Sequence, residues 1–326
     1  MSEGAQNMAE KKADLSLKIA GISFSNPIIA ASGTFGYGRE YSDVIDVSRL
    51  GGICSKGLTL EPRSGNTGRR ILETPSGLMN SIGLENPGIP HFIEHELPKM
   101  LELGPVVIAN LSGSTLNTYV EGARLLDASD VHMIELNISC PNVKAGGMAW
   151  GLDPKAAATV TKAVRRVTNK PLIVKLSPNA LSLVKVAQAV ANVGADVLSL
   201  VNTFQGFALD ITTGKPIFDN ITAGFSGPAI KPLALRMVRD VLLGVPQCSP
   251  ARKFSSVPSE LAISKKHKKN RFVPVIGLGG ISCWQDAAEF LMTGASAIQI
   301  GTAIFANPHV IGDVITGLET FYGRRS

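Results

Sequence analysis

The chain has few cysteines, no long apolar run and none of the common nucleotide-binding signatures. Its four cysteines are widely spaced and form no Cys-x-x-Cys pair, which argues against a disulfide framework, a zinc site or an iron–sulfur cluster. No apolar run approaches the roughly 18 residues of a membrane helix, and the N-terminal MSEGAQNMAEKKADLS lacks the apolar centre of a secretory signal. The glycine patterns of Rossmann and P-loop sites are also absent. We therefore expect a soluble, cytoplasmic protein with reduced thiols.

The excess positive charge is confined to one segment. The formal net charge is +6, and residues 244–272 hold seven Lys or Arg against one acid, Glu260. The rest of the chain carries as many basic as acidic residues. This composition, which includes Ser and Pro, predicts a mobile surface insertion that buries little, and a solvated loop without a partner is the first interpretation. Binding of nucleic acid or an acidic partner is the alternative.

Short β-rich runs alternate with longer helical patterns such as residues 154–167 and 181–193. This alternation indicates βα units and a parallel sheet. The strand candidates are continuous apolar runs, as expected where both faces of a sheet are buried. Eight such units in a chain of this length fit a (β/α)8 TIM barrel better than an open doubly wound sheet. The predicted strands are Pro27–Ala31, Gly52–Lys56, Val106–Asn110, Met133–Ile138, Leu172–Leu176, Val197–Val201, Val273–Gly277 and Ala297–Ile300.

The barrel accounts for nearly the whole chain as one domain. We expect a single domain over residues 15–326, preceded by a disordered tail over residues 1–14 and interrupted by the basic insertion 244–272. Residues 57–90 and 203–228 form long, Gly- and Pro-rich excursions after strands two and six. Loops after barrel strands lie at the C-terminal face, where barrel enzymes have their active sites.

Every predicted strand gives way to a polar residue or a glycine where the chain leaves it. These positions meet at one face of a barrel, where catalytic residues are found. One such residue would mean little, because a lysine beyond a strand is usually a surface group. A full ring of them predicts a polar site at the barrel mouth. The ring comprises Ser32, Lys56, Asn110, Asn137, Lys175, Asn202, Gly279, Gly280, Gly301 and Thr302.

Two glycine motifs predict a phosphate site. GLGGI (277–281) and IGTAI (300–304) follow strands seven and eight, where barrels often bind phosphate with backbone N–H groups and a helix N-terminus. Glycine lets the backbone approach a ligand closely. A tight turn would explain either motif alone, whereas their pairing on neighbouring strands favours phosphate binding.

Two lysines of the ring, Lys56 and Lys175, suit an anionic ligand. Lys175 ends an apolar strand within VKLSPN (174–179), where an unpaired ammonium group would be costly. We expect it to face a delocalised anion or a carbonyl group. A structural acid that pairs with Lys175 is the alternative.

Cys140 lies in NISCPN (137–142), between two carboxamides and directly after an apolar strand. An isolated buried cysteine is usually inert. A thiol beside Pro141 in a polar loop at a barrel mouth can instead be deprotonated and positioned for proton transfer. We interpret Cys140 as reactive and the other three cysteines, Cys54, Cys248 and Cys283, as inert.

Several motifs together resemble the class 1 dihydroorotate dehydrogenases. The resemblance covers roughly residues 15–243 and 273–322. The motif ASGTFGYG (31–38) is more similar to the class 1B catalytic subunit than to the fumarate-using class 1A enzyme. The motifs that carry the resemblance are NISCPN, SKGLT (55–59), NSIGLENPG (80–88), VKLSPN, SLVNT (199–203), SGPAIKPLALR (226–236) and GLGGI.

This resemblance implies a flavoenzyme of pyrimidine (UMP) biosynthesis. The enzyme would oxidise (S)-dihydroorotate to orotate, with FMN as hydride acceptor and Cys140 as general base. The implied FMN contacts are Ser32, Lys56, Gly57, Asn110, Asn137, Lys175, Val201, Gly227, Gly279, Gly280, Gly301 and Thr302. The implied substrate contacts are Lys56, Asn80, Ser81, Ile82, Gly83, Leu84, Asn137, Asn202 and Thr203. No metal site is implied.

The class 1B resemblance further implies that electrons pass from FMN to NAD through a separate subunit carrying FAD and a 2Fe–2S cluster. This chain has neither a cysteine cluster nor a dinucleotide signature, so a second polypeptide would supply both groups. The implied assembly is a heterotetramer built on a homodimer of catalytic chains. The basic segment 244–272 departs from the compact helix-to-strand connection of the family, which leaves the final electron acceptor open.

Two other functions fit parts of the sequence. A dihydropyrimidine dehydrogenase-like enzyme acting on uracil would share the thiol base and the flavin site. A non-catalytic barrel could bind nucleic acid or an acidic protein through 244–272, but the ring of polar strand ends would then be unexplained. A membrane-attached class 2 enzyme uses serine as its base and carries an N-terminal membrane segment, and the sequence shows neither feature.

Overall fold

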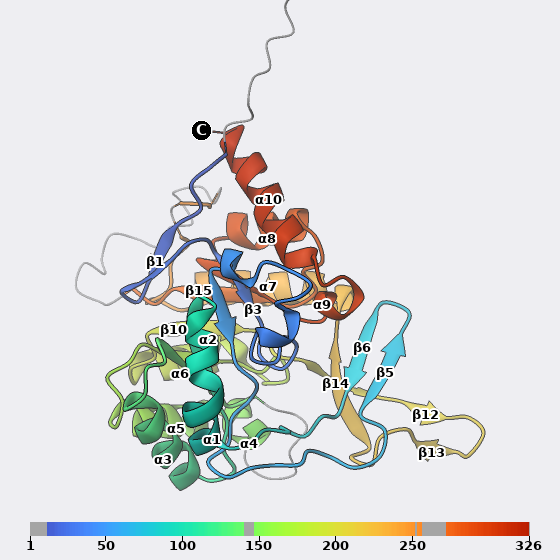
Figure 1. The fold of residues 1–326 in the computed structure, drawn as a ribbon. Helices are drawn as coiled ribbons and strands as arrows, with labels where there is room; N and C mark the ends of the chain where they lie inside the picture. The colour runs from blue at the N-terminus through green and yellow to red at the C-terminus, as the bar shows by residue number, and fades with distance from the viewer. Residues whose placement is uncertain (1–11, 140–146, 252, 256–271, 326) are drawn as a thin grey trace, which may run out of the picture.

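Eight parallel strands form a closed barrel in the computed structural model, which describes residues 12–139, 147–251, 253–255 and 272–325 (Figure 1). All eight predicted strands and the (β/α)8 barrel are confirmed. Neighbouring strands pair in parallel register; for example, Asn137 of the fourth strand pairs with Lys175 of the fifth. The barrel strands are β3 (Ile28–Ala30), β4 (Gly52–Cys54), β7 (Val106–Leu111), β8 (Met133–Asn137), β9 (Leu172–Lys175), β10 (Val197–Leu200), β15 (Val275–Leu278) and β16 (Ala297–Ile300).

Helices between the strands cover the outside of the barrel. Their sequences carry clear start signals: Asp153 accepts a hydrogen bond from Ala156 N (2.8 Å) with Pro154 in the first turn, and Thr115 and Thr118 form a capping box. None of the helices in these described ranges is long and apolar enough to cross a membrane. The helices are α1 (Ile89–His91), α2 (Leu97–Glu102), α3 (Leu116–Asp127), α4 (Gly147–Leu152), α5 (Pro154–Arg165), α6 (Leu183–Asn192), α7 (Lys231–Gly244), α8 (Trp284–Thr293), α9 (Ala303–Ala306) and α10 (Val310–Gly323). There are also three 3-10 helices, η1 (Arg39–Tyr41), η2 (Val47–Arg49) and η4 (Pro228–Ile230), and a π-helical segment, η3 (Phe92–Glu96).

The two ends of the barrel differ in polarity. At the N-terminal end, the hairpin of β1 (Leu17–Ile19) and β2 (Ile22–Phe24) packs Ile19 and Phe24 against inward-facing apolar residues such as Ile29 and Ile173. The C-terminal end holds buried polar side chains instead, including Asn110, Glu135 and Gln299. The apolar plug stabilises the barrel, and the polar end is left for binding and chemistry.

A second, antiparallel sheet lies beyond the C-terminal ends of the barrel strands (Figure 1). It joins the two predicted excursions, because β6 (Gly77–Asn80) pairs with β14 (Thr222–Ser226), placing Asn80 opposite Gly224. The outer strands are β5 (Ile71–Thr74) and β11 (Phe204–Phe207). A hairpin of β12 (Leu209–Asp210) and β13 (Lys215–Pro216) extends from this sheet. The sequence did not predict these strands. They join the two excursions into one sheet over the C-terminal end of the barrel.

Two boundaries need correction. Residues 12–14 were assigned to the disordered tail, but Ala13 N donates to Glu319 O (3.0 Å) and Lys12 pairs with Glu319 (3.1 Å), so the packed chain begins before residue 15. Within the basic segment, Val245, Cys248 and Phe254 are buried, and the Phe254 ring packs on Tyr322. The prediction that 244–272 buries little is therefore wrong for these residues; 252 and 256–271 lie outside the described residues.

Candidate active site

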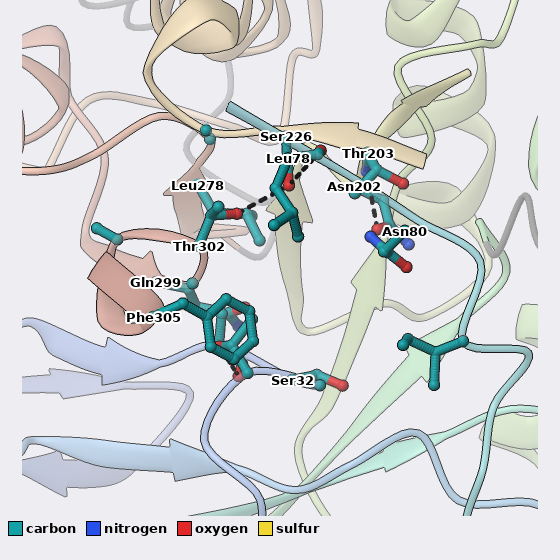
Figure 2. A pocket seen from close by; sticks show the side chains of 18 of the residues that line it. Ser32, Leu78, Asn80, Asn202, Thr203, Ser226, Leu278, Gln299, Thr302 and Phe305 are labelled. Carbon is teal, nitrogen blue, oxygen red and sulfur yellow. Dashed lines mark hydrogen bonds between the residues drawn. The ribbon is translucent and has the colours of Figure 1, made fainter. Parts of the chain in front are cut away.

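A pocket opens at the C-terminal end of the barrel, between the strand ends and the second sheet. It brings together all the described residues that were predicted to bind cofactor or substrate except Asn110 and Ser81. Figure 2 shows several of them around the cavity. The predicted residues that line it are Ser32, Lys56, Gly57, Asn80, Ile82, Gly83, Leu84, Asn137, Lys175, Val201, Asn202, Thr203, Gly227, Gly279, Gly280, Gly301 and Thr302.

Three predicted site residues are not placed in the lining. Asn110 is fully buried behind it, and Ser81 is 2% exposed, with its Oγ accepting a hydrogen bond from Asn66 Nδ2 (3.1 Å). Cys140, the predicted base, lies outside the described residues. The preceding Ser139 is described and fully buried, two residues beyond the end of β8.

A chain of hydrogen bonds fixes the side-chain amides of the site. Asn202 Nδ2 donates to Ser139 Oγ (2.8 Å), and Ser139 Oγ donates to Asn137 Oδ1 (3.1 Å). Asn137 Nδ2 donates to Asn110 Oδ1 (3.2 Å), and Asn110 Nδ2 donates to Glu135 Oε1 (2.7 Å). Because a carboxylate only accepts, Glu135 sets the direction of every bond in the chain. Asn110 therefore positions Asn137 from behind the lining.

Glu135 is a fully buried carboxylate at the centre of the polar end. Its Oε1 accepts from Asn110 and also from Cys54 Sγ (3.3 Å), and Lys175 Nζ lies 3.6 Å from the same oxygen. The side chains of Lys175 and Glu135 are 5% and 0% exposed. The alternative for Lys175, a pairing with a structural acid, is thus what the structure contains. Lys175 also lines the pocket, so the pair holds a cation at the pocket floor.

The other carboxylate oxygen of Glu135 faces two further strands. Ser199 Oγ and Gln299 Nε2 each donate to Oε2 at 2.8 Å. Burial alone would raise the pKa of Glu135, but Lys175 and the hydrogen bonds from Gln299, Ser199 and Asn110 outweigh it and lower that pKa below its usual value. Glu135 is therefore ionised at neutral pH despite its burial.

The same carboxylate acts in the opposite direction on Cys54. Burial, and next the negative charge of Glu135, raise the pKa of the Cys54 thiol well above its usual value. Cys54 consequently stays protonated and donates to Glu135. The predicted inert character of Cys54 agrees with this placement, since a buried, protonated thiol is a poor nucleophile.

On the side of the pocket formed by β15 and β16, glycines bring several backbone segments into close contact. Gly280 has φ +74°, and a Cβ there would lie 2.7 Å from Lys231 N, at the start of α7. Gly227 has φ +104°, and a Cβ there would lie 2.5 Å from Gly77 Cα. Only glycine fits these positions without moving the backbone. Together with the neighbouring lining residues Gly279, Gly301 and Thr302, Gly280 forms a loop cradle beside a helix N-terminus, as predicted for a phosphate site.

Hydrogen bonds connect this cradle to the second sheet. Thr302 Oγ1 donates to Ser226 Oγ (2.8 Å), and Ser226 Oγ donates to Leu78 O (3.4 Å), as Figure 2 shows. Near Lys56, Arg70 pairs with Glu85, a residue of the pocket lining (2.5 Å). The hydrogen bond from Arg70, followed by the nearby charge of Lys56, lowers the pKa of Glu85. The Thr302–Ser226 hydrogen bond thus connects the second sheet to the barrel beside the cradle. The Arg70–Glu85 ion pair stabilises the first excursion near Lys56.

Sequence reasoning missed three polar residues of the site. Glu135 is a charged residue inside the buried run MIELN, and Gln299 is the one polar residue of the strand AIQI, so both carried a signal that was not used. Ser226 directly precedes Gly227 and is the first residue of the motif SGPAIKPLALR (226–236). A polar residue at an inward position of a barrel strand, near its C-terminal end, indicates the floor of a site.

A family model described as "Dihydroorotate dehydrogenase" matches residues 14–246 and 261–322 of the chain. The match thus spans most of the chain. The unmatched residues 247–260 fall within the basic segment, so the departure from the family is shorter than the predicted 244–272. Residues 261–272, which include Lys265 and Lys266, lie inside the matched range.

Curated proteins are similar over nearly their whole length. The chain is 50% identical over 308 residues to the "Dihydroorotate dehydrogenase B (NAD(+)), catalytic subunit" of Petrotoga mobilis, covering 94% of each chain. It is 48% identical over 313 residues to the protein of the same name from Parabacteroides distasonis, covering 96% of this chain and 94% of the relative. The similarity to that from Geotalea daltonii is 47% over 314 residues, with the same coverage. The resemblance predicted from the motifs is confirmed.

Proposed function

The chain belongs to the dihydroorotate dehydrogenase family, and from this premise we propose that it oxidises (S)-dihydroorotate to orotate in pyrimidine biosynthesis. The observation that carries the proposal is the pocket at the barrel mouth, in which nearly all the residues expected to contact FMN and substrate meet. It is an oxidoreductase that acts on a CH–CH bond.

The described residues fit FMN as the cofactor. The cradle formed by Gly279, Gly280, Gly301 and Thr302 offers backbone N–H groups beside the start of α7, which suits a phosphate group. Lys175 places a cation at the pocket floor, where it would face the ring system of a bound flavin. The remaining proposed contacts are Ser32, Lys56, Gly57, Asn137, Val201 and Gly227, with Asn110 acting through Asn137. FMN supplies, when bound, the acceptor for the hydride that leaves C6 of the substrate.

The protein residues bind the substrate and move the proton. Lys56 pairs with the carboxylate of dihydroorotate, while Asn80, Asn137 and Asn202 bond the carbonyl and N–H edges of its ring. The substrate is further enclosed by Thr203, the backbone of residues 81–84 and the second sheet. This enclosure excludes water from the reacting carbon. The chain of hydrogen bonds that ends at Glu135 holds the side-chain amides of Asn137 and Asn202 in fixed orientations. These amides therefore need no reorientation as negative charge develops on the substrate carbonyl.

Cys140 is the general base of this proposal. Oxidation of the C5–C6 bond requires loss of a proton from C5, and the thiolate of Cys140 takes it. Its support is its sequence position, directly after Ser139, whose Oγ bonds both Asn137 and Asn202. Two residues proposed to bind the substrate are therefore tied to the residue that precedes the base.

Electrons leave through a second polypeptide in this proposal. That subunit carries FAD and a 2Fe–2S cluster and passes the electrons to NAD. The names of the relatives, which mention NAD(+) and a catalytic subunit, support a separate subunit and this acceptor. The present chain offers no cysteine cluster in its sequence, and its described residues contain no group that could hold a metal ion. A homodimer of catalytic chains with two such subunits forms the assembly. A cytoplasmic location suits the three described cysteines, all of which are free thiols.

Orotate is expected to bind the FMN-loaded protein roughly 10- to 100-fold more tightly than uracil, because the carboxylate of orotate pairs with Lys56. Spectral titration of the bound flavin measures both affinities. Lys56→Met should remove most of the difference while leaving uracil affinity nearly unchanged. Tighter binding of uracil by the wild-type protein would instead favour an enzyme that acts on uracil.

Gly280→Ala is expected to weaken FMN binding at least about tenfold, because its Cβ would displace the backbone at Lys231 and spoil hydrogen bonds to the phosphate group. The matched control is Gly104→Ala, which has φ +95° but no atom within 4 Å of the added Cβ. Fluorescence titration of apoprotein with FMN measures the effect. Both variants bear the strain of a left-handed residue, so equal losses of affinity would argue against the cradle.

A further inference from the structure

Gln299 lines the pocket and carries a buried hydrogen-bond acceptor without a partner among the described residues. The residue lies on β16, is 1% exposed and lines the cavity (Figure 2). Its Nε2 donates to Glu135 Oε2 at 2.8 Å. Because Glu135 is an ionised carboxylate that can only accept, the amide nitrogen of Gln299 must face it and Oε1 must point elsewhere.

Gln299 Oε1 has no hydrogen-bond partner among the described residues. Buried polar atoms without a partner are few in folded proteins, and each calls for a reason. Of the described side chains that share this property, Gln299 is the one that lines the pocket. The missing partner is therefore expected to be a donor on the molecule that fills the pocket.

We propose that Gln299 is a further cofactor-binding residue, whose Oε1 accepts a hydrogen bond from an uncharged N–H or O–H group of FMN, with Glu135 as its positioning residue. The inference rests on the proposed function, because it requires FMN in this pocket. FMN offers two such donors, the imide N–H of its ring and the hydroxyl groups of its ribityl chain. Gln299 lies two residues before Gly301 of the proposed phosphate cradle, on the same strand and loop.

Replacement of Gln299 by methionine keeps the length and volume of the side chain but removes the acceptor. Titration of Gln299→Met apoprotein with FMN, followed by flavin fluorescence, is expected to give a dissociation constant roughly 3- to 10-fold above that of the wild type. Gln299→Asn, which keeps the amide and shortens its reach, should give a loss in the same direction and serves if the methionine variant does not fold.

Ser199→Ala is the matched control. Ser199 donates to the same oxygen of Glu135 as Gln299 does, also at 2.8 Å, but it does not line the pocket. Ser199→Ala and Gln299→Met thus each remove one donor from Glu135, and only Gln299→Met also removes the acceptor. We expect Ser199→Ala to bind FMN within about twofold of the wild type. Equal weakening by both substitutions would show an effect through Glu135 and overturn direct contact.

Lumiflavin, which keeps the ring imide but has no ribityl chain, separates the two donors. A loss of affinity in Gln299→Met for both FMN and lumiflavin assigns the contact to the ring, and a loss for FMN alone assigns it to the ribityl hydroxyls. Unchanged affinity for both ligands overturns the inference and leaves the proposed function intact. Failure of the wild-type protein to bind FMN would overturn both.

Discussion

Cys140→Ala is expected to keep FMN and orotate affinity but to slow flavin reduction by dihydroorotate about 10²- to 10⁴-fold, the range that a positioned general base contributes. The C5 proton then has no acceptor, whereas the groups proposed to bind the ring and carboxylate are unchanged. Binding should therefore survive while turnover collapses. Anaerobic stopped-flow mixing of the FMN-loaded variant with dihydroorotate measures the rate.

Cys283→Ala provides the control for this substitution. Cys283 is a free, half-buried thiol at the start of α8 and does not line the pocket. Its replacement should leave the reduction rate unchanged. A Cys140→Ala protein that reduces its flavin as fast as the wild type would remove Cys140 from the mechanism.

Glu135→Gln is expected to lower the free energy of unfolding by about 3–5 kcal/mol at neutral pH, because it leaves Lys175 buried without its counter-charge. The substitution keeps the size of the side chain, so the loss reports charge rather than a cavity. Denaturant unfolding of the apoprotein measures it. The control is Glu289→Gln, which breaks the exposed Lys231–Glu289 pair (3.1 Å) and should cost at most about 1 kcal/mol.

The pH dependence of this loss has a defined sign. The folded-state pKa of Glu135 is lowered, so its ionisation stabilises the protein above the unfolded pKa of a glutamate, about 4.3. The contribution is lost as the pH falls through the lower, folded-state value. The stability difference between wild type and Glu135→Gln should therefore be constant near neutrality and shrink in acid. A difference that grows as the pH falls would contradict the assignment.

The barrel was predictable because its strands are continuous apolar runs that end in polar residues. Runs such as Leu172–Lys175 are buried on both faces, so their hydrophobicity is strong and local in the sequence. Barrel geometry alone predicts that the polar residues at the strand ends meet at one face. The assignment of individual ring members to FMN or to the substrate required the family resemblance.

The second sheet could not be predicted for a physical reason. Its strands are short and half-exposed, as in β5, so they lack a clear apolar pattern. Its central pair, β6 with β14, also joins distant parts of the chain, since Asn80 lies opposite Gly224, 144 residues away. Such pairings depend on the barrel first bringing the two excursions together.

The partner of Lys175 was open to prediction but was not assigned. The sequence left a ligand and a structural acid as alternatives, and Glu135 sits forty residues earlier in a strand that was correctly predicted. What the sequence could not give is the register that pairs Asn137 with Lys175 and turns Glu135 inward beside it. A shift of one residue in this strand register would have turned the Glu135 side chain to the outer face of the barrel.

The most direct test is the visible spectrum of the wild-type chain reconstituted with FMN, recorded before and after anaerobic addition of dihydroorotate. The account predicts that the yellow flavin absorbance disappears and that one equivalent of orotate forms for each flavin. A flavin that stays oxidised with dihydroorotate, yet is bleached by dithionite in the same cuvette, would contradict the central claim.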